Sequence, residues 1–469
     1  MKKHNLLYIV FILLFGGCSD FLDESSQDLM VPKSVKDYKE FLYGEGIDNK
    51  TVVNDYLDVM TDDVEEWMTW GFISNDWREL VWGYYTWQAD PEIGINNEMK
   101  ADNAWEVYYH RILVTNVILD QISAMEGGQK EKMDLMGECY FVRAYSYFML
   151  ANLYGKPYLD AESAKKDFCV PINDEKSVSD KMYVRANVAT VYARIMSDVK
   201  KSISSFKESN LSKSIFRPNL SAAYLLASRV ALFQKDYENT IAFVDSVLQN
   251  SDASLCDLKT YSKQEYFFSS LNTELLYTFG WSDNQAFKED TYYLAMLVPS
   301  KTLLGMYKDG DLRLDRYYTG NKKNKPEKWS SYTNVYANAF RLSEAYLNRA
   351  EAYAELGKTQ KAVDDINFLR KYRFSTDRPI SAVNAEDAIM KVREERRMEL
   401  AFEGFRWFDL RRWDRPRIEH KYSSNKDLNT YDIFVLEENS ISYTLPIPKK
   451  ERDLNTVIER LGRPESIKK

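Results

Sequence analysis

The sequence predicts a mostly α-helical protein with an irregular, loop-rich part that carries minor β structure. Apolar residues recur every three or four positions over many long stretches, as on one face of a helix. Glycine and proline, the strongest turn-formers, number only 18 and 12 in 469 residues. These are about 4% and 3%, against averages of roughly 7% and 5%. Two helix pairs also share a similar sequence at a fixed spacing, which indicates repeated helical units.

The N-terminus has the features of an export signal followed by a lipid-attachment cysteine. Two lysines precede the apolar run of residues 6–15. As a helix this run would rise only about 15 Å, half the thickness of the hydrocarbon core of a membrane. We therefore interpret residues 1–17 as a lipoprotein signal peptide. Residues 15–18 (FGGC) resemble a bacterial lipobox, which implies that a lipid is attached to Cys18; a plain secretory signal is the alternative.

The rest of the chain is predicted to be a tether and one domain. Residues 18–33 are polar and acidic, typical of a flexible tether, and residues 34–469 form the domain, with Ser34 capping a first helix. The other predicted helices are 103–122, 133–153, 189–206, 221–233, 237–248, 341–356, 359–372 and 385–402. Residues 251–338 break into short polar pieces, which indicates irregular structure with minor strands.

Composition excludes several classes of function. The net charge of −8 argues against nucleic acid, because a phosphate-binding surface must be basic. Only three histidines are present, which argues against a multi-histidine metal site. Cys139, Cys169 and Cys256 are widely spaced and odd in number, so they predict neither a disulfide framework nor a zinc site. No metal and no cofactor are expected.

Two helix pairs, near 221–250 and 341–372, resemble each other. Residues 224–231 and 346–353 lie 122 positions apart, and each is followed by a tight turn and a second helix. Small residues at Ser228, Ala350 and Ala362 allow close helix approach, as in tetratricopeptide repeats. Ordinary antiparallel helix pairs with a coincidental match are the alternative.

A block of charged and aromatic residues at 396–413 contains two carboxylates one helical turn apart, Glu399 and Glu403. Arg396 and Arg406 lie three residues outside this pair. We interpret the block as an ionic and aromatic clasp that ties the last helices to the repeats. Paired carboxylates can also be the acid and base of glycoside hydrolysis, but neighbouring arginines would keep both ionised. The prediction is that the protein is not an enzyme.

Half of the ten tryptophans lie within residues 67–87. An indole can present its face to the C–H side of a sugar ring while nearby amides and carboxylates bind the hydroxyls. The predicted ligand contacts here are Trp67, Trp70, Asn75, Asp76 and Trp77. The alternative is that the tryptophans form one face of a core helix.

The irregular segment offers a second set of aromatic and polar side chains. The predicted ligand contacts here are Trp281, Asp283, Tyr292 and Trp329. Trp105, by contrast, lies on a well-patterned helix and is predicted to be in the core.

Several motifs together resemble the SusD/RagB family over nearly the whole chain. They are residues 18–23 (CSDFLD), 105–116, 341–352 (RLSEAYLNRAEA), 366–370 (INFLR), 396–413 (RRMELAFEGFRWFDLRRW) and 445–455. The C-terminus departs from the family, because residues 461–465 lack its usual Asn-Pro-Gly ending.

The resemblance implies a SusD-like fold, with tetratricopeptide-like helix pairs as scaffold and a loop-rich ligand-binding half. It implies a glycan-binding lipoprotein on the outer-membrane surface of a Gram-negative, Bacteroidetes-type bacterium. The expected partner is a SusC-like TonB-dependent transporter, over which the protein would close during import of an oligosaccharide. A peptide-binding RagB-like member of the same family and, from another class, a helical glycoside hydrolase are the alternatives.

Overall fold

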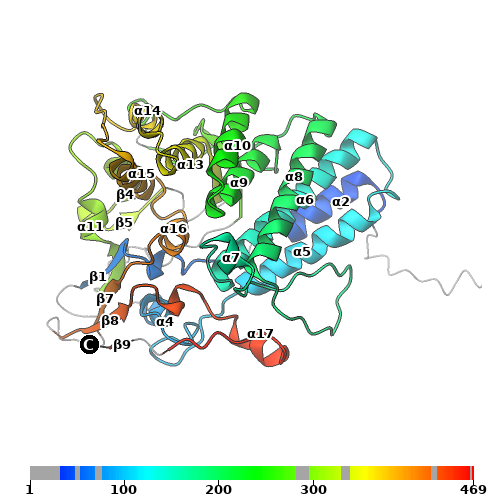
Figure 1. Cartoon of the computed structure of the whole chain (residues 1–469), viewed down its shortest axis with the longest axis horizontal. Coiled ribbons are helices and arrows are strands. Elements are labelled where there is room, and N and C mark those ends of the chain that lie inside the picture. Colours follow the sequence, from blue (N-terminus) through cyan, green and yellow to red (C-terminus); the bar gives the residue numbers. More distant parts are fainter. Residues whose placement is uncertain are drawn as a thin grey trace, which may run out of the picture.

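The computed structural model describes residues 32–47, 53–68, 76–262, 264–280, 295–328, 338–423, 430–464 and 467–468. Helices dominate these residues, and the strands are few and short. Figure 1 shows one group of helices (α2, α5, α6 and α8), a second group from α9 to α15, and the labelled strands β1, β4, β5, β7, β8 and β9 on the side away from the first group. The predicted fold class is confirmed.

The stretches with helical periodicity are helices in the structure. The longer ones are α2 (Val35–Phe41), α5 (Ala104–Gln121), α6 (Gln129–Tyr154), α8 (Val188–Ser209), α9 (Leu220–Phe233), α10 (Tyr237–Asn250), α13 (Leu342–Glu355), α14 (Thr359–Arg370), α15 (Ala385–Glu399) and α16 (Arg406–Arg412). The shorter ones are α3 (Asp76–Leu80), α4 (Trp82–Tyr85), α7 (Ala161–Ala164), α11 (Lys301–Leu304), α12 (Arg313–Arg316) and α17 (Lys449–Leu454).

Local sequence explains where several helices begin and end. The Ser34 hydroxyl accepts a hydrogen bond from the Asp37 N–H, and the Asp37 carboxylate accepts one from the Ser34 N–H at 2.9 Å. This capping box starts α2, as predicted from Ser34. Helix α15 stops at Glu399, earlier than predicted, because the chain turns through Phe402 and Gly404 with φ of 60° and 75°.

The two predicted helix pairs, α9–α10 and α13–α14, pack against each other. Ser228, Ala350 and Ala362 are fully buried, as the repeat pattern requires. The Asn348 amide donates to the Ser228 hydroxyl at 3.1 Å, so α13 contacts α9 directly through a small residue. A tight turn at Gly357, with φ of 70°, connects α13 to α14.

The strands form small antiparallel sheets, two of which join segments that are distant in sequence. Strand β1 (Val64–Met68) pairs with β3 (Ala295–Pro299), and β2 (Leu275–Phe279) pairs with β6 (Asn338–Arg341). A third sheet has the order β7-β8-β9, and β4 pairs with β5. Their bounds are β4 (Tyr318–Thr319), β5 (Lys325–Pro326), β7 (Ile418–Tyr422), β8 (Asp432–Leu436) and β9 (Ile467–Lys468).

One continuous hydrophobic cluster runs from Val35 near the start of the described chain to Ile458 near its end. It includes Trp105, which is 8% exposed and therefore in the core as predicted. Cys139 is fully buried, as expected of a small core residue. The predicted single domain over 34–469 is consistent with this core and stays a prediction.

Candidate functional site

The structure describes only part of the predicted ligand contacts. Trp67 lies in β1, Trp77 lies in α3, and Asp76 is the first residue of α3. The other predicted contacts, Trp70, Asn75, Trp281, Asp283, Tyr292 and Trp329, lie outside the described residues. The alternative of one helical face containing the tryptophans is wrong for Trp67, which lies in a strand.

The pairing of β1 with β3 brings together two described chain ends that border stretches with predicted aromatic contacts. In this antiparallel pair Trp67 is opposite Met296, and Met68 is opposite Ala295. Met68 is the last described residue before the stretch that contains Trp70, and Ala295 is the first one after the stretch that contains Tyr292. The chain therefore enters one predicted segment and leaves the other at the same end of one β ladder.

A buried ion pair joins this end of β1 to α3 and to the end of β7. The Arg78 side chain donates to the Glu66 carboxylate, with Nε to Oε1 at 2.7 Å, and to the Ser423 carbonyl oxygen. The Ser423 N–H donates to the other Glu66 oxygen at 2.8 Å. The Arg78 guanidinium lies over the ring of Tyr422, 3.9 Å from its centre. These bonds hold β1, α3 and the end of β7 together at one point.

We call Glu66, Trp67, Trp77, Arg78 and Ser423 the β1–α3 corner. Figure 1 shows β1, β7 and β8 on the same side of the molecule. Burial raises the pKa of Glu66 and the Arg78 guanidinium opposes this rise. Arg78 is only 2% exposed, so the pair is a scaffold within the corner.

The two described tryptophans of the corner differ in their surroundings. Trp77 is half-buried and packs against the hydrophobic core. Trp67 is also half-buried, and by the two-residue period of a strand it lies on the same face of β1 as Glu65. Glu65 accepts a hydrogen bond from the exposed Lys301 backbone at 3.2 Å. Trp67 is therefore the better candidate for a ligand platform.

The two other described tryptophans of the 67–87 cluster, Trp82 and Trp87, are structural. Trp87 is 1% exposed, donates from Nε1 to the Met60 carbonyl oxygen at 3.0 Å, and stacks on the ring of His420. Trp82 packs edge-on against Phe434, with ring centres 5.9 Å apart. Sequence periodicity did not separate these roles, because the cluster changes from strand to helix within a few residues.

The sequence analysis missed the contribution of the C-terminal strands to the corner. Residues 418–422 alternate between buried and exposed side chains, which is the period of a strand with one buried face. That signal was available in the sequence, but the pairing of Ser423 with Glu66 joins positions 357 residues apart and has no local signature.

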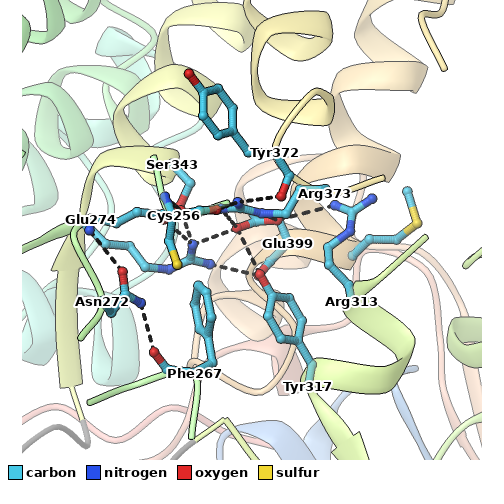
Figure 2. A network of polar contacts seen from close by, with 12 residues as sticks. Cys256, Phe267, Asn272, Glu274, Arg313, Tyr317, Ser343, Tyr372, Arg373 and Glu399 are labelled. Carbon is cyan, nitrogen blue, oxygen red and sulfur yellow. Dashed lines mark hydrogen bonds and ion pairs between the residues drawn. The ribbon is translucent and has the colours of Figure 1, made fainter. Parts of the chain in front are cut away.

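The second place of chemical interest is the carboxylate Glu399, which lies at the centre of a buried ion network (Figure 2). Arg373 donates to both of its oxygens at 2.9 Å, Arg341 donates at 2.6 Å, and Arg313 lies at 3.3 Å. All four side chains are fully buried. Burial alone would raise the pKa of Glu399, but Arg373 and Arg341 outweigh it and hold the pKa well below its usual range.

Glu403 belongs to the same network through different partners. It accepts from Arg341 at 2.8 Å and from the buried Lys328 ammonium. The expectation that Arg396 and Arg406, the neighbours in sequence, would compensate this carboxylate pair is wrong. Arg396 instead binds Asp409 and Arg406 binds Asp62, each at 2.8 Å, because α15 ends before Glu403. The network ties the end of α15 to the α13–α14 pair, in line with the clasp interpretation, but through arginines from elsewhere in the chain.

Among the described residues, no group of three or more His, Cys, Asp or Glu side chains is arranged to hold a metal ion. Within that same part of the chain, no helix has both the length and the apolar character needed to cross a membrane.

Comparison with known families and proteins gives consistent matches. A family described as "Starch-binding associating with outer membrane" matches residues 20–232, and the SusD family matches residues 278–461. SusD-like protein P25 of Formosa agariphila is 20% identical, with 98% of each chain covered. SusD-like protein P2 of the same organism is 23% identical, covering 88% of this chain and 91% of the relative.

Solved structures share the fold. A SusD superfamily protein from Bacteroides thetaiotaomicron superposes with a TM-score of 0.71 at 22% identity, covering 92% of this chain and all of the other. A SusD-like carbohydrate binding protein from Bacteroides vulgatus gives a TM-score of 0.64 at 18% identity, covering 91% and 97%.

The fold defines a helical scaffold protein with tetratricopeptide-like pairs and an irregular part beside them. The two family matches follow one another along the chain, over residues 20–232 and 278–461. The chain belongs to the SusD/RagB family.

Proposed function

We propose that this chain is a cell-surface lipoprotein that binds an oligosaccharide and delivers it to a SusC-like, TonB-dependent transporter in the outer membrane. Membership of the SusD/RagB family supports the proposal. So does the description of a relative in fold as a carbohydrate binding protein. The ligand site is the β1–α3 corner together with the aromatic segments that begin and end there.

The observation that carries the site is the register of β1 and β3. It places the chain ends that flank both predicted aromatic segments side by side, at Met68 and Ala295. Trp67 lies at this end of the ladder, and Arg78, Glu66 and Ser423 hold the adjoining segments in place. A preformed base beside the half-buried Trp67 suits an oligosaccharide, because a preformed site loses less entropy on binding.

The test is the substitution Trp67→Ala. A glycan array finds an oligosaccharide that the wild-type chain binds, and calorimetry then measures its affinity for each variant. We expect Trp67→Ala to weaken binding by about tenfold or more, roughly 1.4 kcal/mol, with an unchanged melting temperature. Trp87→Ala is the matched stability control, because truncation of a buried aromatic costs about 3–5 kcal/mol. If Trp67→Ala, Trp77→Ala, Trp281→Ala and Trp329→Ala all retain full affinity, the aromatic-platform proposal is wrong.

The same proposal includes the absence of glycoside hydrolysis. Glu399 is held ionised by arginines and is fully buried, so it suits neither protonation of a leaving group nor contact with substrate. The purified mature chain should release no reducing ends from any glycan that it binds. Sustained release that disappears in Glu399→Gln or Glu403→Gln would contradict this.

A peptide cargo is the alternative within the family, and the array separates the two cases when peptides are included. If the chain binds short peptides and no glycan, the proposed cargo is a peptide instead of an oligosaccharide. An aromatic site can hold either class, so the corner itself does not choose between them.

The lipid anchor is proposed at Cys18, which lies outside the described residues. Cys18→Ala should release the protein from the outer-membrane fraction, because a thiol is required for attachment of the diacylglycerol. An unchanged distribution on fractionation would show that the protein is held at the membrane in another way.

A further inference from the structure

A concave surface lies apart from the β1–α3 corner. It is a groove of about 510 Å³ between α5, the loop of residues 171–183 and the segment that begins with α17. Its lining includes Trp105, Tyr109, Tyr183, Glu451, Leu454 and Asn455. We call it the α5–α17 groove. Figure 1 shows α17 below α5, away from β1 and α15.

Hydrogen bonds hold the walls of the groove in place. The Trp105 and Tyr109 rings are 4.8 Å apart, and the Tyr109 hydroxyl donates to the Pro171 carbonyl oxygen at 2.7 Å. The Asn455 amide nitrogen donates to the Tyr183 carbonyl oxygen at 2.8 Å. The groove is therefore a preformed feature that links three distant segments.

The rim of the groove is apolar and exposed. Met182 and Leu454, which line the groove, are 52% and 67% exposed. Three more exposed aliphatic residues continue the two rim segments, namely Val178, Val184 and Val457. Grouped exposed apolar side chains mark a surface that another protein covers, because each costs free energy in water. Sugar hydroxyl groups would gain nothing from this aliphatic rim.

Several acceptor groups of the groove have no hydrogen-bond donor or cation as partner among the described residues. The Asn455 side-chain oxygen is buried without a hydrogen-bond partner. Among the described residues no cation pairs with the Asp180 or Glu451 carboxylates, both of which line the groove. The nearby cations are engaged elsewhere: Lys181 pairs with Glu175, Lys450 with Glu106 and Arg452 with Asp90. The groove thus has unmatched acceptors and negative charge.

We propose that the α5–α17 groove is the docking site for a loop of a protein partner that presents an aliphatic or aromatic side chain beside a lysine or arginine. The apolar side chain would fill the space between Tyr183 and Leu454, and the cation would meet Glu451 and the Asn455 oxygen. The docking proposal rests on the proposed function, in which the protein partner is the outer-membrane transporter.

The test places a photo-crosslinking amino acid in the full-length chain, expressed in its own outer membrane. Met182 and Leu454 are the test positions. Val383 and Met390, which are 87% and 59% exposed and lie beside or on α15, are the matched controls. We expect crosslinks to a barrel transporter, identified by mass spectrometry, from the test positions and not from the controls.

Charge variants give an independent readout. Leu454→Glu and Glu451→Lys should each reduce co-purification of the transporter by about tenfold or more, while Val383→Glu leaves it unchanged. Oligosaccharide affinity and melting temperature should stay at wild-type values in all three.

Crosslinks to the transporter from the controls alone overturn the inference and leave the proposed function standing. Absence of a crosslink from every position, together with no co-purification, overturns both. Loss of oligosaccharide affinity in the groove variants with undiminished co-purification shows that the groove holds glycan, and this also overturns the docking proposal.

Discussion

Trp67 and Trp87 lie in one tryptophan-rich stretch, yet the structure gives them different surroundings. Trp87 is enclosed, with its indole nitrogen bonded to Met60 and its ring on His420. Trp67 is half-buried at the end of β1. At the scale of a residue, composition predicted an aromatic site, and only the fold separates side chains that could contact a ligand from those that form the core.

His420 is buried between aromatic rings, with Tyr85 at 4.1 Å and Trp87 at 4.3 Å between ring centres. Burial lowers its pKa to about 4, although the Tyr85 and Thr61 carbonyl oxygens favour the charged ring. The unfolded chain therefore binds the proton first as the pH falls below about 6.5. The contribution of His420 to the free energy of unfolding is therefore full above that pH. It declines as the pH falls towards 4, by about 3 kcal/mol in total.

The prediction is tested by urea unfolding of wild type and His420→Gln between pH 7 and pH 4. The variant should be less stable at pH 7, and its stability should fall less on acidification, by about 3 kcal/mol. Asp58 and Asp102 have pKa values raised to about 7 and about 6, so their effect on the pH dependence of stability has the opposite sign. Both residues are present in wild type and in the variant, and their effect cancels when the two proteins are compared. His110→Gln is the control, because His110 is on the surface beside Glu45. If the free energies of unfolding of wild type and His420→Gln fell equally between pH 7 and pH 4, the prediction would be wrong.

At the scale of an element, the close contact of α6 with α8 depends on Gly137. A methyl group added there would come within 2.6 Å of the Phe206 ring on α8. The Ser202 hydroxyl of α8 also donates to the Gly137 carbonyl oxygen at 2.8 Å. Glycine in the middle of a helix is destabilising, but here the lack of a side chain allows α6 and α8 to pack closely.

Gly137→Ala should therefore destabilise the protein by about 1–3 kcal/mol despite the better helix propensity of alanine. Gly44→Ala is the control, because a methyl group there meets nothing within 4 Å. It should be neutral or stabilising by up to about 1 kcal/mol. Denaturant unfolding measures both, and a Gly137→Ala variant as stable as wild type would show that Phe206 moves aside freely.

The elements differ in how well the sequence predicted them. Long helices such as α8 follow from periodicity, because an amphipathic face repeats over several turns. The sheet of β7, β8 and β9 was not predicted, since short strands leave few repeats to detect. The partners of Glu399 were unpredictable for another reason: Arg341 and Arg313 lie 58 and 86 residues from it in the chain. The bonded partners in the β1–α3 corner are also distant in sequence, because they join β1 to the end of β7.

At the scale of the whole molecule, the ion network around Glu399 connects the parts that the sequence distinguishes. Glu274 lies just before β2 in the irregular part, Arg341 ends β6 and directly precedes α13, and Glu399 ends α15. Arg341 reaches both Glu274 and Glu399, and Arg373 does the same. Because these charges are buried, each depends on the others for compensation.

This connection predicts that residues 34–469 unfold as one unit. The hydrophobic cluster is continuous from Val35 to Ile458, and the ion network leaves uncompensated charge on either side if one part opens alone. Calorimetry of the mature chain should therefore show a single transition. Glu399→Gln should shift the whole transition down without splitting it, at a cost of about 3–5 kcal/mol, because it removes one of the two anions that the buried Arg341 and Arg373 share. Glu162→Gln is the control, since this exposed carboxylate pairs only with a neighbouring lysine. Two resolved transitions in wild type would show that the helix pairs and the irregular part are separate domains.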